Sequence, residues 1–376
     1  MKKILHVFGT RPEAIKMAPV VKAFEANKKF CSKVCVTAQH REMLDQVLQL
    51  FEITPDYDLD LMTPGQSLNE ITSAVLLNLK LVLAEYRPDL LLVHGDTATT
   101  FAASLAAYYE KIDVGHVEAG LRTGNIYSPW PEEINRKLTG SIARFHFTPT
   151  DVSRQNLLSE GVAADAIYVT GNTVIDALLS VKNKIQKDEK LGVQLTSKFG
   201  GIDFSKKVIL VTGHRRENFG AGFEEICKAI AQLSDERQDI EIVYPVHLNP
   251  NVQIPVKKML SEYANIHLIE PLDYLPFIFL MMKSHIILTD SGGIQEEAPS
   301  VGKPVLVMRD TTERPEAVEA GTVRLVGSNA ARIVKAVVTL LDNTNQYAQM
   351  CNSTNPYGNG HASQLITKII EEKYDI

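Results

Sequence analysis

The sequence predicts an α/β protein with two Rossmann-like domains, each built on a doubly wound parallel sheet. Short apolar runs rich in β-branched residues alternate with helical patterns from one end of the chain to the other. The runs are continuously apolar, as in strands buried on both faces, and helices between such strands are typical of parallel order. At 376 residues the chain also exceeds the usual size of one hydrophobic core, so two domains are expected.

The expected strands form two groups, separated by a polar stretch. The first group comprises residues 3–8, 33–38, 90–95, 114–119, 145–150 and 167–171, and the second comprises residues 208–213, 240–246, 266–270, 285–290 and 304–308. Residues 181–207 are rich in Lys, Gly and polar residues and contain no strand-like run. We therefore expect the boundary between Thr170 and Asp176, with a first domain over residues 1–172 and a second over residues 173–357.

Composition narrows the classes of function. The net charge of -6 argues against nucleic acid or an anionic membrane as a main partner. The sequence contains no apolar run of membrane-spanning length, and its first residues turn polar too soon for a signal peptide, so a cytoplasmic protein is expected. The four cysteines are scattered without a CxxC pair, which favours reduced structural thiols over a zinc site or a disulfide framework.

Polar residues follow most of the expected strands. In open α/β sheets, ligands bind outside the carboxyl ends of the strands. Both domains would therefore present polar groups at one sheet edge, and a shared cleft between the domains is the simplest arrangement. The residues at these ends are Thr10, Arg11, His94, Asp96, His116, Glu118, Thr150, His214 to Glu217, His247, Asp290 to Gly293, and Arg309 to Arg314.

The segment from Thr289 to Ala317 has the features of a nucleotide diphosphate site. A strand runs into Gly292 and Gly293, where the main chain can approach a pyrophosphate, and a helix is expected to open at Ile294. A glutamate one turn along that helix could accept both hydroxyls of a ribose. Neither GxGxxG nor GxxxxGK[ST] occurs, so we expect neither a nicotinamide enzyme nor a P-loop kinase, and no cofactor. The alternative is a turn that needs glycine for packing alone.

Basic residues that could meet phosphate occur in two copies of the tetrapeptide RPEA, at residues 11–14 and 314–317. In each copy the proline suits the first turn of a helix, which places the arginine at the helix start. Arg11 with Lys16, and Arg314 in the other domain, could neutralise phosphate. Alternatively, both arginines are capping residues in solvent.

Three carboxylates and one histidine are candidates for chemistry. Paired carboxylates can move protons and stabilise positive charge at an anomeric carbon, and Asp96, Glu118 and Glu132 could do so, although their spacing does not separate acid from base. His214 could hydrogen-bond a phosphate and, when protonated, assist departure of a diphosphate. Each carboxylate alone could equally be a helix cap. No short metal-binding spacing joins the histidines, so no metal site is expected.

Long motifs over nearly the whole chain carry a resemblance to one family. They include FGTRPEAIKMAP, TAQHREMLDQV, HGDTATT, GHVEAGLRTG, SPWPEEINR, TGNTVIDAL, VTGHRRENFG, PVHLNPNV and LTDSGGIQEEAPSVGKPVLVMRDTTERPEA. In these stretches the chain resembles the non-hydrolysing UDP-N-acetylglucosamine 2-epimerases of bacteria. The resemblance implies the glycosyltransferase-B fold, with a C-terminal helix in residues 358–376 that returns to the first domain. It also implies a homodimer, and reversible interconversion of UDP-GlcNAc and UDP-ManNAc.

The resemblance also implies roles for individual residues. The catalytic set would be Asp96, Glu118, Glu132 and His214, with His214 on the diphosphate. Glu297 is expected on ribose, and Leu272 and Phe277 near uracil, where Leu272 can offer only backbone polar groups. The implied substrate-binding positions are Arg11, Lys16, Asp96, Glu118, His214, Leu272, Phe277, Ser291, Gly292, Gly293, Glu297 and Arg314.

Many members of the family bind a second UDP-GlcNAc as an allosteric activator. The positions that match this site are Gln39, His40, Arg215 and His247. Glu42 departs from the glutamine of some relatives, and a carboxylate near a diphosphate would weaken its binding. Whether activation operates here is left open.

The chemistry of this reaction fits the candidate residues. The C2 proton of a hexosamine is not next to a carbonyl and is too weakly acidic for simple removal. If the bond from C1 to UDP stretches first, oxocarbenium character acidifies that proton, and a carboxylate can take it to leave 2-acetamidoglucal and UDP. The weighed alternatives are a hydrolysing 2-epimerase, a retaining glycosyltransferase and a non-catalytic sensor of nucleotide sugars. UDP-ManNAc made by such an enzyme would supply surface polysaccharide.

Overall fold

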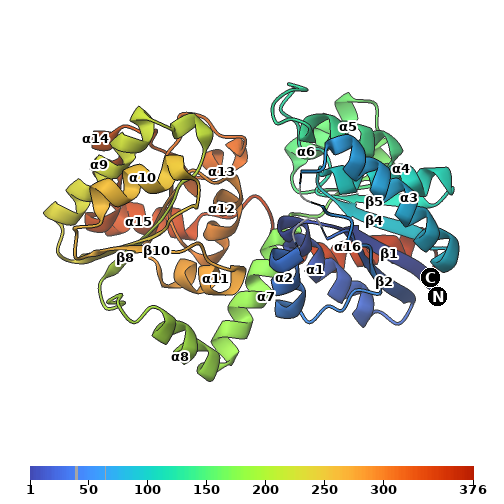
Figure 1. The fold of residues 1–376 in the computed structure, drawn as a ribbon, viewed down its shortest axis with the longest axis horizontal. Coiled ribbons are helices and arrows are strands. Elements are labelled where there is room, and N and C mark those ends of the chain that lie inside the picture. Colours follow the sequence, from blue (N-terminus) through green and yellow to red (C-terminus); the bar gives the residue numbers. More distant parts are fainter. Residues whose placement is uncertain (39–40, 64) are drawn as a thin grey trace. The chain divides into compact units, whose positions relative to one another are not determined.

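A computed structural model describes residues 1–38, 41–63 and 65–376. The chain divides into two compact units (Figure 1). The first unit comprises residues 1–177 and 357–376, and the second comprises residues 178–356. Both units are α/β, as the sequence predicts.

The first unit contains a seven-stranded parallel sheet with the strand order β3-β2-β1-β4-β5-β6-β7. The six expected strands are confirmed, and a seventh, β3, was not predicted, because two paired residues at the sheet edge leave no apolar run. The strands are β1 Lys2–Phe8, β2 Phe30–Val36, β3 Tyr57–Asp58, β4 Leu90–His94, β5 Asp113–Val117, β6 Phe145–Thr148 and β7 Ile167–Val169.

Helices on both faces of this sheet bury its central strands. Leu5 and Leu91 of the sheet pack with Leu79 of α3 in one continuous apolar cluster, and all three are inaccessible to solvent. The helices are α1 Arg11–Ala26, α2 Arg41–Leu50, α3 Leu68–Tyr86, α4 Ala98–Tyr109, α5 Glu132–Ile142, α6 Asp151–Ser159, α7 Thr173–Lys187 and α16 Ala362–Lys373, with a 3-10 turn at Ala164–Ala166. Helix α7 begins in the first unit and continues into the second.

The last helix of the chain packs in the first unit. Helix α16 lies against α1, and Figure 1 shows the red C-terminal helix beside the blue N-terminal elements. The Asp176 carboxylate, in α7, accepts hydrogen bonds from the backbone N–H groups of Ala362 (3.2 Å) and Ser363 (2.8 Å) and from the Ser363 hydroxyl (2.6 Å). Since His361 at the N-cap of α16 makes no capping bond of its own, Asp176 caps this helix from another element.

The second unit contains a six-stranded parallel sheet with the order β10-β9-β8-β11-β12-β13. The five expected strands are confirmed, and β13 was not predicted, because it is a three-residue edge strand with arginine at its centre. Between Val181 and Lys207, where β8 begins, the structure contains no strand, as predicted. The strands are β8 Lys207–Thr212, β9 Ile240–Pro245, β10 Ile266–Ile269, β11 Ile286–Thr289, β12 Val305–Val307 and β13 Val323–Leu325.

Helices also cover this second sheet. A single cluster of buried apolar residues includes Ile209 of β8, Leu288 of β11, Ile230 of α9 and Val337 of α14. The helices are α8 Glu189–Lys198, α9 Ala221–Glu236, α10 Pro250–Leu260, α11 Tyr274–Lys283, α12 Gly292–Glu297, α13 Pro315–Glu319, α14 Ala330–Asp342 and α15 Thr344–Asn352, with 3-10 turns at Arg216–Asn218 and Ala298–Val301.

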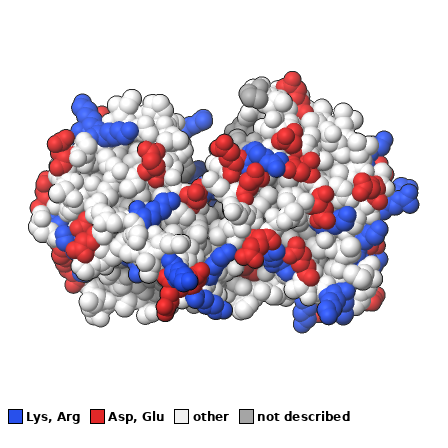
Figure 2. Space-filling view, turned by 60° about the horizontal axis from the view of Figure 1, so that its bottom comes forward, with Lys and Arg blue, Asp and Glu red and all other residues white. Residues whose placement is uncertain are grey.

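The surface charge, the lengths of the helices and the state of the cysteines can be compared with the expectations from composition. On the face drawn in Figure 2, basic and acidic side chains are interspersed, in keeping with the small net charge of -6. Within the described ranges, no helix is long and apolar enough to cross a membrane. All four cysteines are free thiols.

Candidate functional site

Glu118 follows β5 at the carboxyl edge of the first sheet and is held from several elements. Its Oε1 forms an ion pair with Lys16 of α1 and accepts a hydrogen bond from Asn172 Nδ2 at 2.8 Å. Only 7% of its side chain is exposed. Its φ of 63° lies in the left-handed region, which costs a non-glycine residue about 1–3 kcal/mol. The fold therefore fixes one carboxylate in place despite a backbone cost, as is common at functional positions.

His94, the last residue of β4, lies beside Glu118. Its Nε2 is 3.3 Å from Glu118 Oε2. Burial lowers the pKa of His94 to about 4, and although the Glu118 charge opposes this effect, the nearby Lys16 adds to it. His94 is therefore neutral near pH 7, and its contact with Glu118 is not an ion pair.

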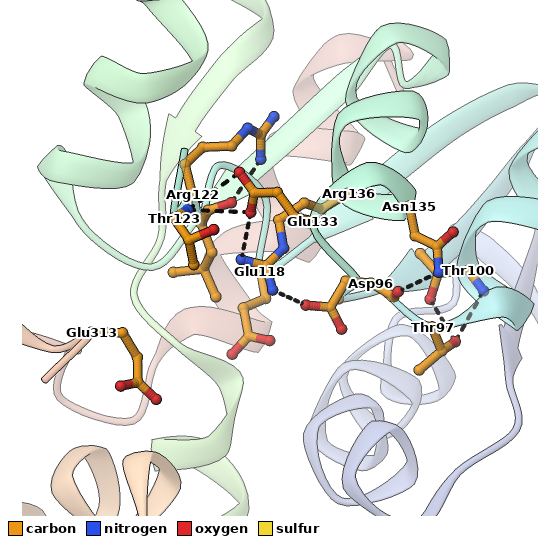
Figure 3. Close-up of polar contacts among 12 residues, drawn as sticks. Asp96, Thr97, Thr100, Glu118, Arg122, Thr123, Glu133, Asn135, Arg136 and Glu313 are labelled. Carbon is orange, nitrogen blue, oxygen red and sulfur yellow. Dashed lines mark hydrogen bonds and ion pairs between the residues drawn. The ribbon is translucent and has the colours of Figure 1, made fainter. Parts of the chain in front are cut away.

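Asp96, in the turn after β4, is the second carboxylate at this edge. Its Oδ2 lies 2.5 Å from Nη2 of Arg136, in α5 (Figure 3). Burial is the main cause that raises the pKa of Asp96, and the charges of Glu118 and Glu132 raise it further, while Arg136 opposes them. The carboxyl group thus holds its proton to higher pH than an ordinary aspartate, which suits acid/base chemistry.

Arg136 is itself positioned by a fully buried carboxylate. Arg136 Nη1 lies 3.3 Å from Glu133 Oε2. Glu133 also accepts hydrogen bonds from the backbone N–H groups of Thr123 (3.2 Å) and Gly124 (3.1 Å), as Figure 3 shows for Thr123. Glu133 thereby links residues 123–124 to the arginine that contacts Asp96. Sequence reasoning missed Glu133 and Arg136, because their roles depend on partners distant in sequence.

Glu132 is the first residue of α5 and is partly buried. Its Oε2 is buried, and no hydrogen-bond partner for this atom occurs among the described residues. Its charge acts on Asp96. The first unit thus brings together three predicted carboxylates, Asp96, Glu118 and Glu132, with Lys16.

The first RPEA copy starts a helix, as predicted. Arg11 is the first residue of α1, and Thr10 with Glu13 forms a capping box at that end. Lys16, which was expected to neutralise phosphate, is paired with Glu118. Gln39 and His40, two positions predicted for an activator, lie outside the described residues. Glu42 is exposed in the first turn of α2.

In the second unit, His214 follows β8 and Asp290 follows the neighbouring strand β11. The Asp290 carboxylate accepts hydrogen bonds from the backbone N–H groups of His214 and Arg215, both at 2.9 Å. The His247 ring stacks on His214, with centroids 5.3 Å apart. Burial lowers the pKa of His214, and His247 and Arg215 add to this effect, while Asp290 opposes it. Arg215 pairs with Glu313 at 2.9 Å.

The prediction that a helix opens at Ile294 is wrong. Helix α12 begins at Gly292, with Ser291 at its N-cap, because the two glycines adopt helical backbone angles rather than a separate turn. A β-carbon on Gly293 would meet no atom within 4 Å, so open space adjoins this residue. The backbone here can be approached closely by a ligand, as the diphosphate interpretation requires.

The two glutamates of α12 differ in their partners. Glu296 is buried and forms an ion pair with Arg314. Arg314 occupies the N-cap of α13 without a side-chain capping bond, but its side chain is held by Glu296 rather than solvated. Glu297 Oε1 accepts a hydrogen bond from the Tyr274 hydroxyl at 2.7 Å. Tyr274, in the first turn of α11, was missed by sequence reasoning. Leu272 and Phe277, the predicted uracil positions, flank it in sequence and are partly buried.

His116 was expected among the polar residues at the strand ends, but its ring meets a backbone carbonyl group. It is buried in β5, and its Nε2 lies 2.6 Å from the Gly95 carbonyl oxygen. Burial lowers the pKa of His116 to about 3. Across the described residues, no group of three His, Cys, Asp or Glu side chains is arranged to hold a metal ion.

Comparison with known proteins identifies the family. The model of the family "UDP-N-acetylglucosamine 2-epimerase" matches residues 22–371. The UDP-N-acetylglucosamine 2-epimerase of Escherichia coli K12 is 62% identical over 98% of each chain. The crystal structure of the Neisseria meningitidis UDP-GlcNAc 2-epimerase bound to UDP-GlcNAc has a TM-score of 0.91 and 57% identity, over 98% of this chain and 100% of that one.

A more distant structure bears on the fold alone. A glycosyltransferase from Rickettsia africae has a TM-score of 0.63 at 15% identity, over 99% of this chain and 98% of that one. The two parallel-sheet units are therefore those of the glycosyltransferase-B fold, as predicted. With a family model over most of its length and close relatives over nearly all of it, the chain belongs to the UDP-N-acetylglucosamine 2-epimerase family.

Proposed function

We propose that this protein catalyses the reversible C2 epimerisation of UDP-GlcNAc to UDP-ManNAc without hydrolysis. The observation that carries the proposal is the pair of carboxylates at the edge of the first sheet. Glu118 is fixed by Lys16, and Asp96 has a raised pKa beside it. Proton removal and return at one carbon need two acid/base groups, and two carboxyl groups at one sheet edge can supply them.

Epimerisation proceeds by elimination and readdition. The bond from C1 to the UDP oxygen breaks, and UDP leaves with its electron pair. A carboxylate removes the C2 proton, and the electron pair of the broken C2–H bond forms the C1=C2 bond of 2-acetamidoglucal. A carboxylic acid then returns a proton to the other face of C2 as the UDP oxygen attacks C1. Asp96, Glu118 and Glu132 supply the acid/base groups and stabilise positive charge at C1.

The second unit supplies the groups for UDP. The backbone at Gly292 and Gly293 and the start of α12 approach the diphosphate, with Ser291 beside them. Arg314 neutralises phosphate charge, and His214 donates to a diphosphate oxygen when protonated. Arg11 is a further candidate for neutralising phosphate charge. Glu297, oriented by Tyr274, accepts from the ribose hydroxyls, and Leu272 and Phe277 border uracil.

The test is incubation with UDP-GlcNAc in D₂O, followed by proton NMR. We expect UDP-ManNAc to form and deuterium to enter C2 of both nucleotide sugars. If neither occurs, the protein is not an epimerase, and binding of unchanged UDP-GlcNAc would support a sensor. Release of stoichiometric UDP with free ManNAc would instead indicate a hydrolysing enzyme.

Regulation by a second UDP-GlcNAc forms a further part of the proposal. Arg215 and His247 occupy positions that match the activator site of the family, together with Gln39 and His40. The stacking of His247 on His214 supports a link between that site and the diphosphate. A sigmoidal dependence of rate on UDP-GlcNAc, lost in His247→Ala, is the expected result.

We also propose that the protein forms a homodimer through the outer face of α3 and α4. These two helices pack side by side and expose Leu77 (70%), Leu81 (69%), Tyr108 (61%) and Tyr109 (67%). Large apolar side chains gathered on neighbouring helices are typical of an interface. Sedimentation should show a dimer, and Leu81→Glu with Tyr108→Glu should give a monomer.

The UDP-ManNAc formed by the proposed reaction would serve as a ManNAc donor for surface polysaccharide.

A further inference from the structure

Asp290 is a buried acid without a role in the chemistry proposed above. It lies at the carboxyl end of β11 and is inaccessible to solvent. Its Oδ2 accepts three hydrogen bonds, from the backbone N–H groups of His214 and Arg215 at 2.9 Å and from Asn218 Nδ2 at 3.3 Å. These donors fix the orientation of the carboxylate and the backbone on which His214 stands.

The other oxygen of Asp290 is directed at the His214 ring. Asp290 Oδ1 is buried, and the described residues offer it no hydrogen-bond partner. It lies 3.6 Å from His214 Nδ1, slightly beyond hydrogen-bond distance, so a small ring rotation would complete the bond. A buried carboxylate oxygen left unpaired costs free energy, which favours a proton on Nδ1 to meet it.

The other charged and titratable neighbours of His214 do not compete for this nitrogen. His247 stacks face to face on the ring, and its own Nδ1 accepts from the backbone N–H of Asn249 at 3.1 Å. Arg215 extends to Glu313 instead. Asp290 is the group positioned to select the tautomer of His214.

We propose that Asp290 is a positioning residue that holds His214 with its proton on Nδ1, turns Nε2 toward the ligand, and stabilises the ring when Nε2 becomes protonated. The role of Nε2 at a diphosphate rests on the proposed function. The tautomer does not, because it follows from Asp290 alone. Carboxylates that orient a histidine in this way are well known in hydrolases.

The test is the tautomer of His214, read from long-range proton–nitrogen NMR spectra of the ¹⁵N-histidine-labelled protein. The His214 signals are assigned by their loss in His214→Gln. In the wild-type protein we expect the proton on Nδ1. A wild-type proton on Nε2 overturns the proposal, and this measurement needs no variant of Asp290 to fold.

Asp290→Asn should reverse the tautomer. The amide oxygen must take the place of Oδ2 toward the three donors, so the NH₂ group faces Nδ1, which can then only accept. The proton moves to Nε2, and kcat should fall about 100-fold or more, as is usual when an acid/base histidine is held in the wrong tautomer. The pKa of His214 should also fall, because an attractive charge is lost.

A second carboxylate–histidine pair in the same unit supplies the control. Glu241 Oε2 lies 2.5 Å from His267 Nε2, on β9 and β10, away from the strand ends that carry the proposed site. Glu241→Gln should change the His267 signals and leave kcat unchanged. An unchanged His214 tautomer in Asp290→Asn overturns the proposal. If the wild-type protein shows the expected tautomer but no epimerisation, the proposed function fails and the positioning role stands.

Discussion

Arg136 Nη2 lies 2.5 Å from Asp96 Oδ2, and this ion pair opposes the effects that raise the pKa of Asp96. Burial and the charges of Glu118 and Glu132 favour the protonated acid, whereas the guanidinium favours the carboxylate. The balance between these effects decides at what pH Asp96 can exchange a proton with the substrate.

Removal of the Arg136 charge should shift the pH dependence of catalysis. In Arg136→Met the pKa of Asp96 rises further, because only the opposing effect is lost. The limb of the pH profile of kcat/KM that reports Asp96 should therefore move to higher pH, whichever limb that is. Steady-state rates between pH 5 and pH 10, measured by coupled detection of UDP-ManNAc, test this expectation.

The control for Arg136 is another arginine–aspartate pair of the same unit. Arg144 Nη1 lies 2.5 Å from Asp113 Oδ2, at the opposite end of β5 from Glu118. Arg144→Met should leave the profile in place. A profile of Arg136→Met that matches the wild type would show that Arg136 does not govern the ionisation of Asp96.

Glu118→Gln should abolish most activity without preventing binding. The amide keeps the shape of the side chain but cannot take the C2 proton, so kcat should fall by about 10²–10⁴ while KM changes little. Deuterium entry at C2 should slow by the same factor, which rates in D₂O measure directly. Glu25→Gln, at an exposed glutamate of α1 paired with Lys22, should behave as the wild type. Unchanged exchange in Glu118→Gln would exclude this residue as a proton acceptor.

Much of the fold could be predicted because each central strand carries its own apolar signal. Strands β3 and β13 were missed because two or three residues at a sheet edge owe their pairing to the neighbouring strand. The start of α12 was misplaced because glycine is compatible with both a turn and a helix. Tertiary context decided each of these cases.

The candidate site could be predicted only in part. Asp96, Glu118 and His214 follow strands directly, so their position at a sheet edge follows from local pattern. Their partners do not: Arg136 meets Asp96 across 40 residues, and Asp290 meets His214 across 76. Pairings over such distances depend on strand order, which the sequence alone left open.

Asp176→Ala should destabilise the first unit by removing the cap of α16. Loss of the hydrogen bonds to Ala362 and Ser363 should lower the free energy of unfolding by about 1–2 kcal/mol. Burial raises the pKa of Asp176, so the folded state binds its proton more tightly than the unfolded state does. The stabilisation by Asp176 should therefore grow as pH falls through the folded pKa, and the gap between wild type and variant should widen.

Urea unfolding followed by circular dichroism at several pH values measures this gap. Asp165→Ala, at an exposed aspartate of the same unit, is the matched control and should show no gap. A gap that narrows on acidification would contradict the raised pKa.

Tyr274→Phe should weaken UDP binding with little effect on the chemical step. The hydroxyl donates to Glu297 Oε1 at 2.7 Å, and without it the carboxylate that we assign to ribose loses its fixed orientation. A hydrogen bond to a charged group contributes about 1.5–3 kcal/mol, so the dissociation constant for UDP should rise by about tenfold or more. Titration calorimetry with UDP measures this constant, and kcat at saturating UDP-GlcNAc should stay within about threefold of wild type, since groups remote from C2 act on ground state and transition state alike. Tyr168→Phe, at a tyrosine of the first unit whose hydroxyl donates to the Asp165 carbonyl oxygen, should leave UDP affinity unchanged.

If Tyr274→Phe binds UDP as tightly as the wild type, Glu297 does not depend on Tyr274 for its contact with ribose, or makes no such contact. Glu297→Gln separates these two outcomes, because it weakens UDP binding only if the carboxylate itself meets the ribose hydroxyls.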